Sequence, residues 1–352
     1  MNAVNGPQEA DAILSHKADQ PIDIFNEGPL RIVLAVAGPD DFYLLMIGHH
    51  VFLDMTGMRI IMQDYLDLCL APQAADAGLL PAPDPKQSFF SYAQQEDNML
   101  RNGTYEKRVE YWLRQLSTAD PDLHITTKQG NRPEHAPKSI PFSLDEEAYE
   151  RFSARAHRLQ VTPFALVSSA LFHALRQYTG QSELLLGVAS DARRRPFERT
   201  AGMFSGMFLL RQSEQAIGMS DAAVRANFKN VMQAVRNYLN YFCFMDQIPW
   251  LKQRSALGPA TSDVFIDFWP KNAPSQSSVG RRSDVTVTAF PLLSRSIPFE
   301  QPLTNWTFGL IGDTQEYGLS GMIEYDSSVI PESAAREILD SWKAALTQNP
   351  AL

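Results

Sequence analysis

An α/β architecture, with helices packed on sheets in two lobes, is the fold class that this sequence predicts. Apolar segments of strand length alternate with segments whose apolar residues recur at helical spacing. Hydrophobic residues make up 44% and charged residues 20%, as in ordinary folded domains. The 352 residues are also long for one hydrophobic core. We therefore expect an N-terminal lobe over residues 1–123 and a C-terminal lobe over residues 124–352.

The first predicted elements are a strand hairpin and the helix that follows it. Residues 1–20 are polar, and we expect them to be loose or marginally helical. Residues 31–37 (RIVLAVA) and 42–48 (FYLLMIG) are nearly continuously apolar, and the turn residues Gly38-Pro39-Asp40-Asp41 join them. Apolar residues then recur at helical spacing over residues 56–70, which predicts a helix directly after the second strand.

Strands and helices continue to alternate along the rest of the chain. Residues 79–87 carry three prolines and predict a connector, and residues 87–116 predict a helix broken near Asn102-Gly103. The same criteria predict further helices at residues 146–159, 163–178, 221–242 and 331–346, and further strands at residues 139–144, 183–189, 207–211, 264–269, 285–289, 306–311 and 318–325.

Charge and cysteine content exclude several classes of protein. The net charge of -9 argues against a nucleic-acid partner, since such partners need a concentrated basic surface and the run Arg193-Arg194-Arg195 is short. Cys69 and Cys243 lie in apolar stretches, so we expect two buried thiols and no disulfide framework. The first residues have neither the basic region nor the apolar region of a signal peptide, and no apolar run reaches membrane-spanning length, so we expect a cytoplasmic protein with no membrane partner. We also expect a monomer.

The most informative segment is GHHVFLDMTG at residues 48–57, at the exit of an apolar strand. Two adjacent histidines, with Asp54 four residues after the second, could bind a metal, anchor a loop or place one imidazole as a proton acceptor. A zinc site needs a third ligand at a recognisable interval, but the other histidines are scattered and the cysteines are remote. Both imidazoles could also simply satisfy hydrogen bonds at the strand end.

This segment resembles the HHxxxDG signature of nonribosomal peptide synthetase condensation domains and related acyltransferases of the chloramphenicol acetyltransferase superfamily. Other similar segments follow in the order of that family, and the resemblance covers nearly the whole chain from about Pro21 onward. They are YWLRQL at residues 111–116, QVTPFAL at residues 160–166, RQYTGQ at residues 176–181, RRRP at residues 193–196, GMF at residues 202–204, QIPW at residues 247–250 and LSGMIEYD at residues 319–326.

The resemblance implies two chloramphenicol-acetyltransferase-like lobes in a V-shaped pseudo-dimer, with a tunnel between them and the first lobe incomplete. It implies transfer of an acyl or peptidyl group from a thioester to an amine, or sometimes a hydroxyl, in nonribosomal peptide or related secondary-metabolite biosynthesis. The substrates would be carried on the phosphopantetheine of carrier proteins or on coenzyme A, with no metal and no bound cofactor. The implied partners are acyl or peptidyl carrier protein domains or other synthetase modules.

The resemblance also assigns roles to individual residues. His50 matches the second histidine of the signature and would act as the catalytic base, a role worth about two to four orders of magnitude in rate. His49 matches the first histidine and would be structural. Asp54 would hold the loop by pairing with an arginine, and Gly57 would open the following helix.

Three departures from the family pattern affect these expectations. Only 48 residues precede His49, so we expect an early strand and helices of the family fold to be missing, together with an RHxxLR-like segment whose arginine would support Asp54. Arg31 or an arginine among residues 193–195 would have to replace it. Met55 replaces the glycine of HHxxxDG and would gate access to His50. Gly206 replaces a common asparagine and removes a polar side chain near the tunnel.

These departures keep two alternatives open. A catalytically silent relative would bind a carrier protein or a synthetase partner, an interpretation that the short first lobe and Met55 favour. An active relative could instead transfer its acyl group to a hydroxyl or to a non-peptide scaffold, as standalone members of the superfamily do.

Overall fold

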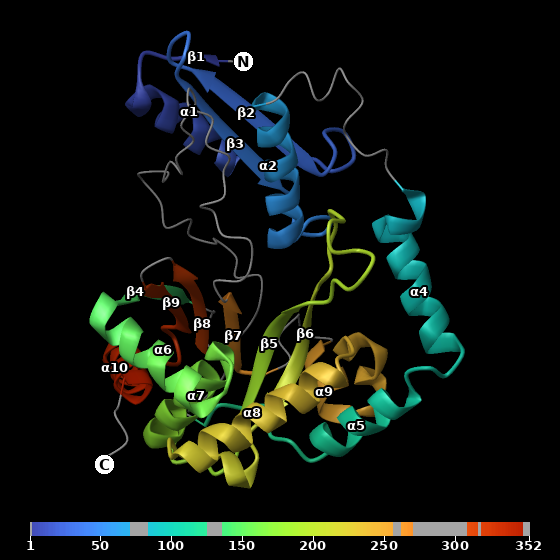
Figure 1. The fold of residues 1–352 in the computed structure, drawn as a ribbon, viewed down its shortest axis with the longest axis vertical. Helices are drawn as coiled ribbons and strands as arrows, with labels where there is room; N and C mark the ends of the chain where they lie inside the picture. The colour runs from blue at the N-terminus through green and yellow to red at the C-terminus, as the bar shows by residue number, and fades with distance from the viewer. Residues whose placement is uncertain are drawn as a thin grey trace. The chain divides into compact units, whose positions relative to one another are not determined.

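The computed structural model describes residues 2–70, 84–124, 136–255, 262–269, 308–315 and 318–347. These residues form two compact units (Figure 1). The first unit comprises the described residues within 1–98 and 191–205, and the second comprises those within 99–190, 206–269 and 308–347. The predicted strand at residues 285–289 and most of the connector at residues 79–87 lie outside the described residues.

The unit boundaries differ from the predicted division after residue 123. Residues before this point already belong to the second core, where Trp112 and Leu116 are buried. Residues 191–205, which we had expected in the C-terminal lobe, belong to the first unit. A boundary drawn at one point of the sequence could not represent a chain that leaves a compact unit and returns to it.

The first unit is built on a three-stranded sheet with the order β1-β2-β3. Strand β2 runs antiparallel to β3, with Leu30 opposite Gly48 and Val36 opposite Phe42, which confirms the predicted hairpin. The elements of this unit are β1 (Asn2–Ala3), α1 (Pro7–Asp19), β2 (Leu30–Val36), β3 (Phe42–Gly48), α2 (Met55–Leu70), η1 (Pro85–Gln87) and α4 (Phe89–Arg101).

Of the two expectations for residues 1–20, loose or marginally helical, the structure shows the helical one, as the 13-residue helix α1. Helix α1 packs on the first sheet, where Ala10 and Leu14 are buried in one cluster with Val33 and Ala35. These apolar positions of α1 share one helical face, and Pro7 stands in the first turn, where its missing N–H costs nothing. Strand β1 adds to the sheet parallel to β2.

The second unit contains a six-stranded mixed sheet with the order β4-β9-β8-β7-β5-β6. Its strands are β4 (Pro137–Leu144), β5 (Leu185–Asp191), β6 (Ser205–Arg211), β7 (Val264–Trp269), β8 (Phe308–Gln315) and β9 (Gly318–Asp326). Its helical elements are α5 (Glu106–Leu116), α6 (Glu146–Leu159), α7 (Pro163–Thr179), η2 (Glu214–Ala216), α8 (Asp221–Arg236), η3 (Tyr241–Cys243), η4 (Met245–Gln247), α9 (Pro249–Ser255) and α10 (Glu332–Thr347).

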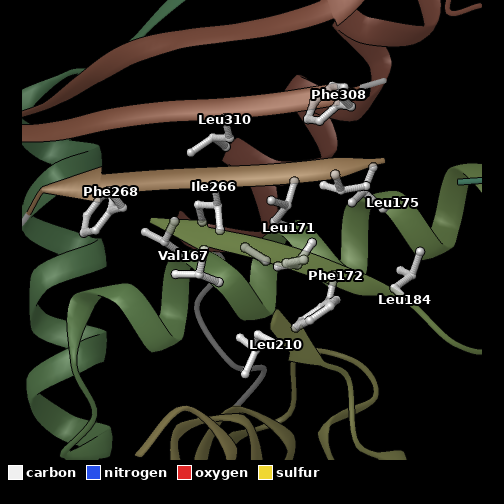
Figure 2. Packing of buried hydrophobic residues seen from close by; sticks show 14 of the residues in the cluster. Val167, Leu171, Phe172, Leu175, Leu184, Leu210, Ile266, Phe268, Phe308 and Leu310 are labelled. Atoms are coloured by element: carbon white, nitrogen blue, oxygen red, sulfur yellow. The ribbon is translucent and has the colours of Figure 1, made fainter. Parts of the chain in front are cut away.

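Helix α7 forms the centre of the second core (Figure 2). Its buried side chains include Val167, Leu171 and Phe172, which lie in the same cluster as Ile266 and Leu310 of the sheet. The helix starts where the Thr162 hydroxyl accepts a hydrogen bond from the backbone of the first turn, and ends at a glycine with positive φ. These signals explain why the sequence predicted its bounds well.

One predicted helix of the second unit is shorter than expected. The helix expected over residues 221–242 ends at Arg236, because Asn237 leaves the helical conformation and the Asn240 side chain accepts from Phe242 N to begin a separate 3₁₀ turn.

The expectation of two buried thiols was wrong, since Cys69 is exposed and Cys243 is only partly buried. Among the helices described here, none is long and apolar enough to cross a membrane.

Candidate functional site

The two histidines lie in a tight turn directly after β3. The backbone N–H of His49 donates to Pro29 O at 2.9 Å, and its carbonyl accepts from Phe52 N and Leu53 N at 2.9 and 3.1 Å. Val51 N donates to the Nδ1 atom of His49 at 3.2 Å, so this nitrogen carries a lone pair rather than a proton. The His49 ring is therefore engaged in closing the turn.

The His50 ring differs from that of its neighbour because it is exposed. Its Nδ1 atom lies 3.3 Å from the carbonyl oxygen of Leu53. Since a carbonyl can only accept, this contact favours the tautomer with the proton on Nδ1 and the lone pair on Nε2. A neutral imidazole with a free lone pair on Nε2 has the form that a general base requires.

Asp54 closes the same loop from inside the protein, where it is only 1% exposed. Its Oδ1 atom accepts from Gly57 N at 2.7 Å and from Arg193 Nη2 at 2.7 Å. Its Oδ2 atom accepts from Phe204 N at 2.7 Å, Ser205 N at 2.9 Å and Arg193 Nη1 at 2.9 Å. The carboxylate thus caps α2 and ties the loop to residues 193–205 of the same compact unit.

Arg193 is the partner that the sequence left undetermined between Arg31 and residues 193–195. Its side chain is 4% exposed and binds Asp54 through both terminal nitrogens. Arg193 Nη1 also donates to Asp191 Oδ1 at 3.0 Å, and Asp191 Oδ2 accepts from the Thr56 hydroxyl at 2.9 Å. Arg31 pairs instead with Glu27, so it takes no part in this network.

The environment of Asp54 keeps it ionised. Burial acts to raise the pKa of this carboxyl, but the hydrogen bonds and charge of Arg193, together with the N–H groups of Gly57 and Phe204, outweigh it and lower the pKa below its ordinary value. Bidentate pairing with an arginine is strong and directional, so the cluster also fixes the orientation of the loop.

Gly57 and Met55 lie in the first turn of α2. Helix α2 begins at Met55, so the expectation that Gly57 opens the helix is off by two residues. A Cβ atom on Gly57 would lie 3.0 Å from the backbone N and O of Gly202, which explains the glycine by close approach. Met55 is 55% exposed at the same end of the helix.

Gly206 has a different environment from the one we expected. A Cβ atom there would lie 2.0 Å from the hydroxyl oxygen of Tyr238 and 3.3 Å from Asn240 Nδ2. Two polar side chains from the segment after α8 therefore occupy the place of a residue-206 side chain. The sequence offered no signal for this replacement, since about thirty residues separate the two segments.

The structure brings His49, His50, Asp54, Met55 and Gly57 together on one loop and helix start, while Gly206 belongs to the second unit. Sequence analysis missed the N–H donors of Phe204 and Ser205 and the pair of Thr56 with Asp191. Within the ranges that the structure describes, no group of three or more metal-ligating side chains lies close enough to hold an ion.

The site thus combines an α/β fold with an HHxxxD loop that directly follows a strand and is closed by an arginine and aspartate pair. The sequence profile of the condensation domain family matches residues 2–349. The chain therefore belongs to the condensation domain family.

Known proteins agree with this assignment. The chain is similar to cyclosporin synthetase simA of Tolypocladium inflatum, with 24% identity over 268 residues that cover 74% of this chain and 2% of the synthetase. The condensation domain of the monacolin K polyketide synthase MokA superposes with a TM-score of 0.75 at 17% identity, covering 98% of this chain and 78% of that one. The X-domain from teicoplanin biosynthesis, solved in complex with OxyB, gives a TM-score of 0.72 at 16% identity, with 98% and 75% covered.

Proposed function

We propose that this chain is a condensation-type acyltransferase in which His50 accepts the proton of the attacking nucleophile. The donor would be an acyl or peptidyl group held as a thioester, on the phosphopantetheine of a carrier protein or on coenzyme A. The observation that carries the proposal is the exposed His50 ring on a loop that is fixed from behind by Asp54 and Arg193. Membership of the condensation domain family supplies the class of reaction.

The chemistry needs one group that takes and returns a proton. As an amine attacks the thioester carbonyl, a C–N bond forms and His50 Nε2 accepts the proton that the nitrogen loses. The C–S bond then breaks, and the departing thiolate takes up that proton, so the products are an amide and a thiol. An alcohol in place of the amine would give an ester by the same balance.

His49 and Asp54 have supporting roles in this proposal. The His49 ring closes the turn, and the Asp54 carboxylate fixes the first turn of α2 relative to residues 193–205. Their work is to hold the His50 ring in one orientation, since a catalytic group that is misplaced by about 1 Å can lose about a hundredfold in rate. Neither of them needs to contact substrate.

A direct test is thiol release from a panel of acyl-pantetheine thioesters in the presence of amine and alcohol acceptors, with products identified by mass spectrometry. Wild-type protein should release thiol and form an amide or ester, whereas His50→Gln should do neither at a comparable rate. Equal turnover by both proteins would remove His50 from the mechanism.

Two observations favour a second candidate, a silent domain that binds a partner. Met55 is exposed where the family signature has glycine, and one structural relative, the teicoplanin X-domain, was solved in complex with OxyB. On this alternative the partner of the present chain would be a carrier protein or another synthetase domain. Binding of a carrier protein without thiol release across the whole thioester panel would support it.

A further inference from the structure

The backbone of Gly202 contacts the loop that carries the two histidines, residues 49–54. Its carbonyl oxygen accepts a hydrogen bond from Asp54 N at 3.3 Å and another from Arg193 Nη2 at 3.1 Å. Both donors belong to the cluster that fixes the loop. Gly202 therefore lies against the loop through main-chain atoms alone.

The same backbone is packed closely on two sides. A Cβ atom on Gly202 would lie 2.8 Å from Cδ2 and 3.0 Å from Cβ and Cγ of Phe89, the first residue of α4. A Cβ atom on Gly57 would likewise lie 3.0 Å from the backbone N and O of Gly202. Gly202 is thus in close contact with the first turns of both α2 and α4.

Space, not backbone conformation, requires glycine at this position. Gly202 is not among the residues with positive φ, so alanine could adopt its backbone angles. Phe89 packs edge-on against Phe204 with ring centroids 5.1 Å apart, and the Arg193 guanidinium lies 4.4 Å from the centroid of the Phe204 ring. Rotating the Phe89 ring would relieve its contact but leave its Cβ atom, which moves only with α4.

We infer that Gly202 is a positioning residue that determines the position of the His50 ring. A methyl group at residue 202 must push its backbone away from Phe89, and that movement displaces Asp54, whose N–H donates to the Gly202 carbonyl and which lies four residues after His50. The effect of this displacement on turnover rests on the proposed function. Its effect on the position of the His50 ring does not.

The test compares Gly202→Ala with Gly38→Ala, a matched change in the same unit at a glycine with no neighbouring atom within 4 Å of an added Cβ. The readout is the NMR signal of the His50 ring in histidine-labelled protein, identified by its loss in His50→Gln. Gly202→Ala should shift this signal and Gly38→Ala should not. A folded Gly202→Ala protein whose His50 signal overlays that of the wild type would overturn the inference.

A second variant tests the route of the effect. Phe89→Ala removes the two ring contacts and leaves one at 3.0 Å, so the shift caused by Gly202→Ala should be smaller in that background. If the single Gly202→Ala variant does not fold, the double variant should fold better than it. If Phe89→Ala folds normally but the double variant folds no better than Gly202→Ala, the steric explanation is contradicted.

Activity gives an independent measurement. A displacement of about 1 Å should lower kcat by about a hundredfold with a smaller change in KM, while Gly38→Ala leaves both unchanged. Wild-type protein without thiol release would count against the proposed function alone, because the NMR comparison still tests the role of Gly202. Normal kcat together with a shifted His50 signal would show that the displaced ring is not the base, which again leaves the positioning role intact.

Discussion

Asp54 and His50 stand four residues apart on one loop, yet their surroundings are opposite. Asp54 is 1% exposed and accepts five hydrogen bonds, two of them from a buried arginine. The His50 ring is exposed and, in the part of the chain described here, has one side-chain hydrogen bond, to its own loop. The contrast separates the residue that fixes the loop from the residue that remains accessible to a substrate, which is how a preorganised site is built.

The largest effect should come from the open end of the loop. His50→Ala should lower kcat for acyl transfer by about two to four orders of magnitude, because it removes the proposed general base. The melting temperature should stay close to that of the wild type, since the ring is exposed. Thiol-release kinetics and thermal unfolding measure the two quantities.

His49→Ala is the matched control for this prediction. It removes the Nδ1 acceptor of the turn bond to Val51, so its main cost should be about 1 kcal/mol of stability. If His49→Ala stays folded and its kcat falls as much as that of His50→Ala, His50 alone cannot be the base and the proposed assignment is contradicted.

Substitution of Asp54, at the buried end of the loop, should mainly lower the free energy of unfolding. Asp54→Ala should lower the free energy of unfolding by about 3–5 kcal/mol, because it removes the carboxylate that pairs with the buried Arg193 guanidinium. Asp64→Ala is the control, since Asp64 pairs with Arg199 at an exposed site and should cost at most about 1 kcal/mol. Urea unfolding measures both, and equal losses would show that the buried pair has no special weight.

The stability that Asp54 contributes should also depend on pH. The folded-state pKa of Asp54 is lowered, so its contribution to stability is fully present above the ordinary carboxyl value of 3.8 and is lost as the pH falls through the lower folded value. The stability difference between wild type and Asp54→Asn should therefore be constant near neutral pH and shrink below pH 3.8. A difference that does not change down to pH 2 would contradict the lowered pKa.

Met55→Gly should change the rate less than His50→Ala and in the opposite direction, and it sharpens the comparison at the exposed end of the loop. If Met55 gates the acceptor, its removal should raise kcat/KM severalfold or widen the range of amines used, at a cost of about 1 kcal/mol for glycine in a helix. Met58→Ala, on the same helix, is a control for general loosening of α2. No change in rate or acceptor range would remove the gating role.

Local patterns in the sequence predicted most of the elements. The apolar hairpin of β2 and β3 and the capped helix α7 followed from periodicity and turn residues that act over a few positions. The sequence indicated the N-terminal helix α1 only weakly, as a loose or marginally helical segment, because its burial depends on Val33 and Ala35 of a later strand. Elements whose stability comes from distant packing carry a weak local signal.

The candidate site shows the same limit. The resemblance pointed to His50 and Asp54, but it left the arginine open between residue 31 and residues 193–195. The pair of Asp54 with Arg193 spans 139 residues, and no local pattern reports such a contact. Gly206 shows this limit again, because no local pattern indicated that Tyr238 and Asn240 would lie where a residue-206 side chain would extend.

The reach from Asp54 to Arg193 also bears on biosynthesis. Asp54 leaves the ribosome 139 residues before its arginine, which at about 5–20 residues per second is a wait of about 7–28 s. During that interval only Gly57 N among its five donors has been made, because the other four belong to residues 193–205. The turn that displays His50 therefore lacks most of its support until those residues are synthesised. Expression of the N-terminal segment alone should yield a polypeptide with an unfinished histidine turn, and supplying residues 191–205 in trans offers a way to complete it.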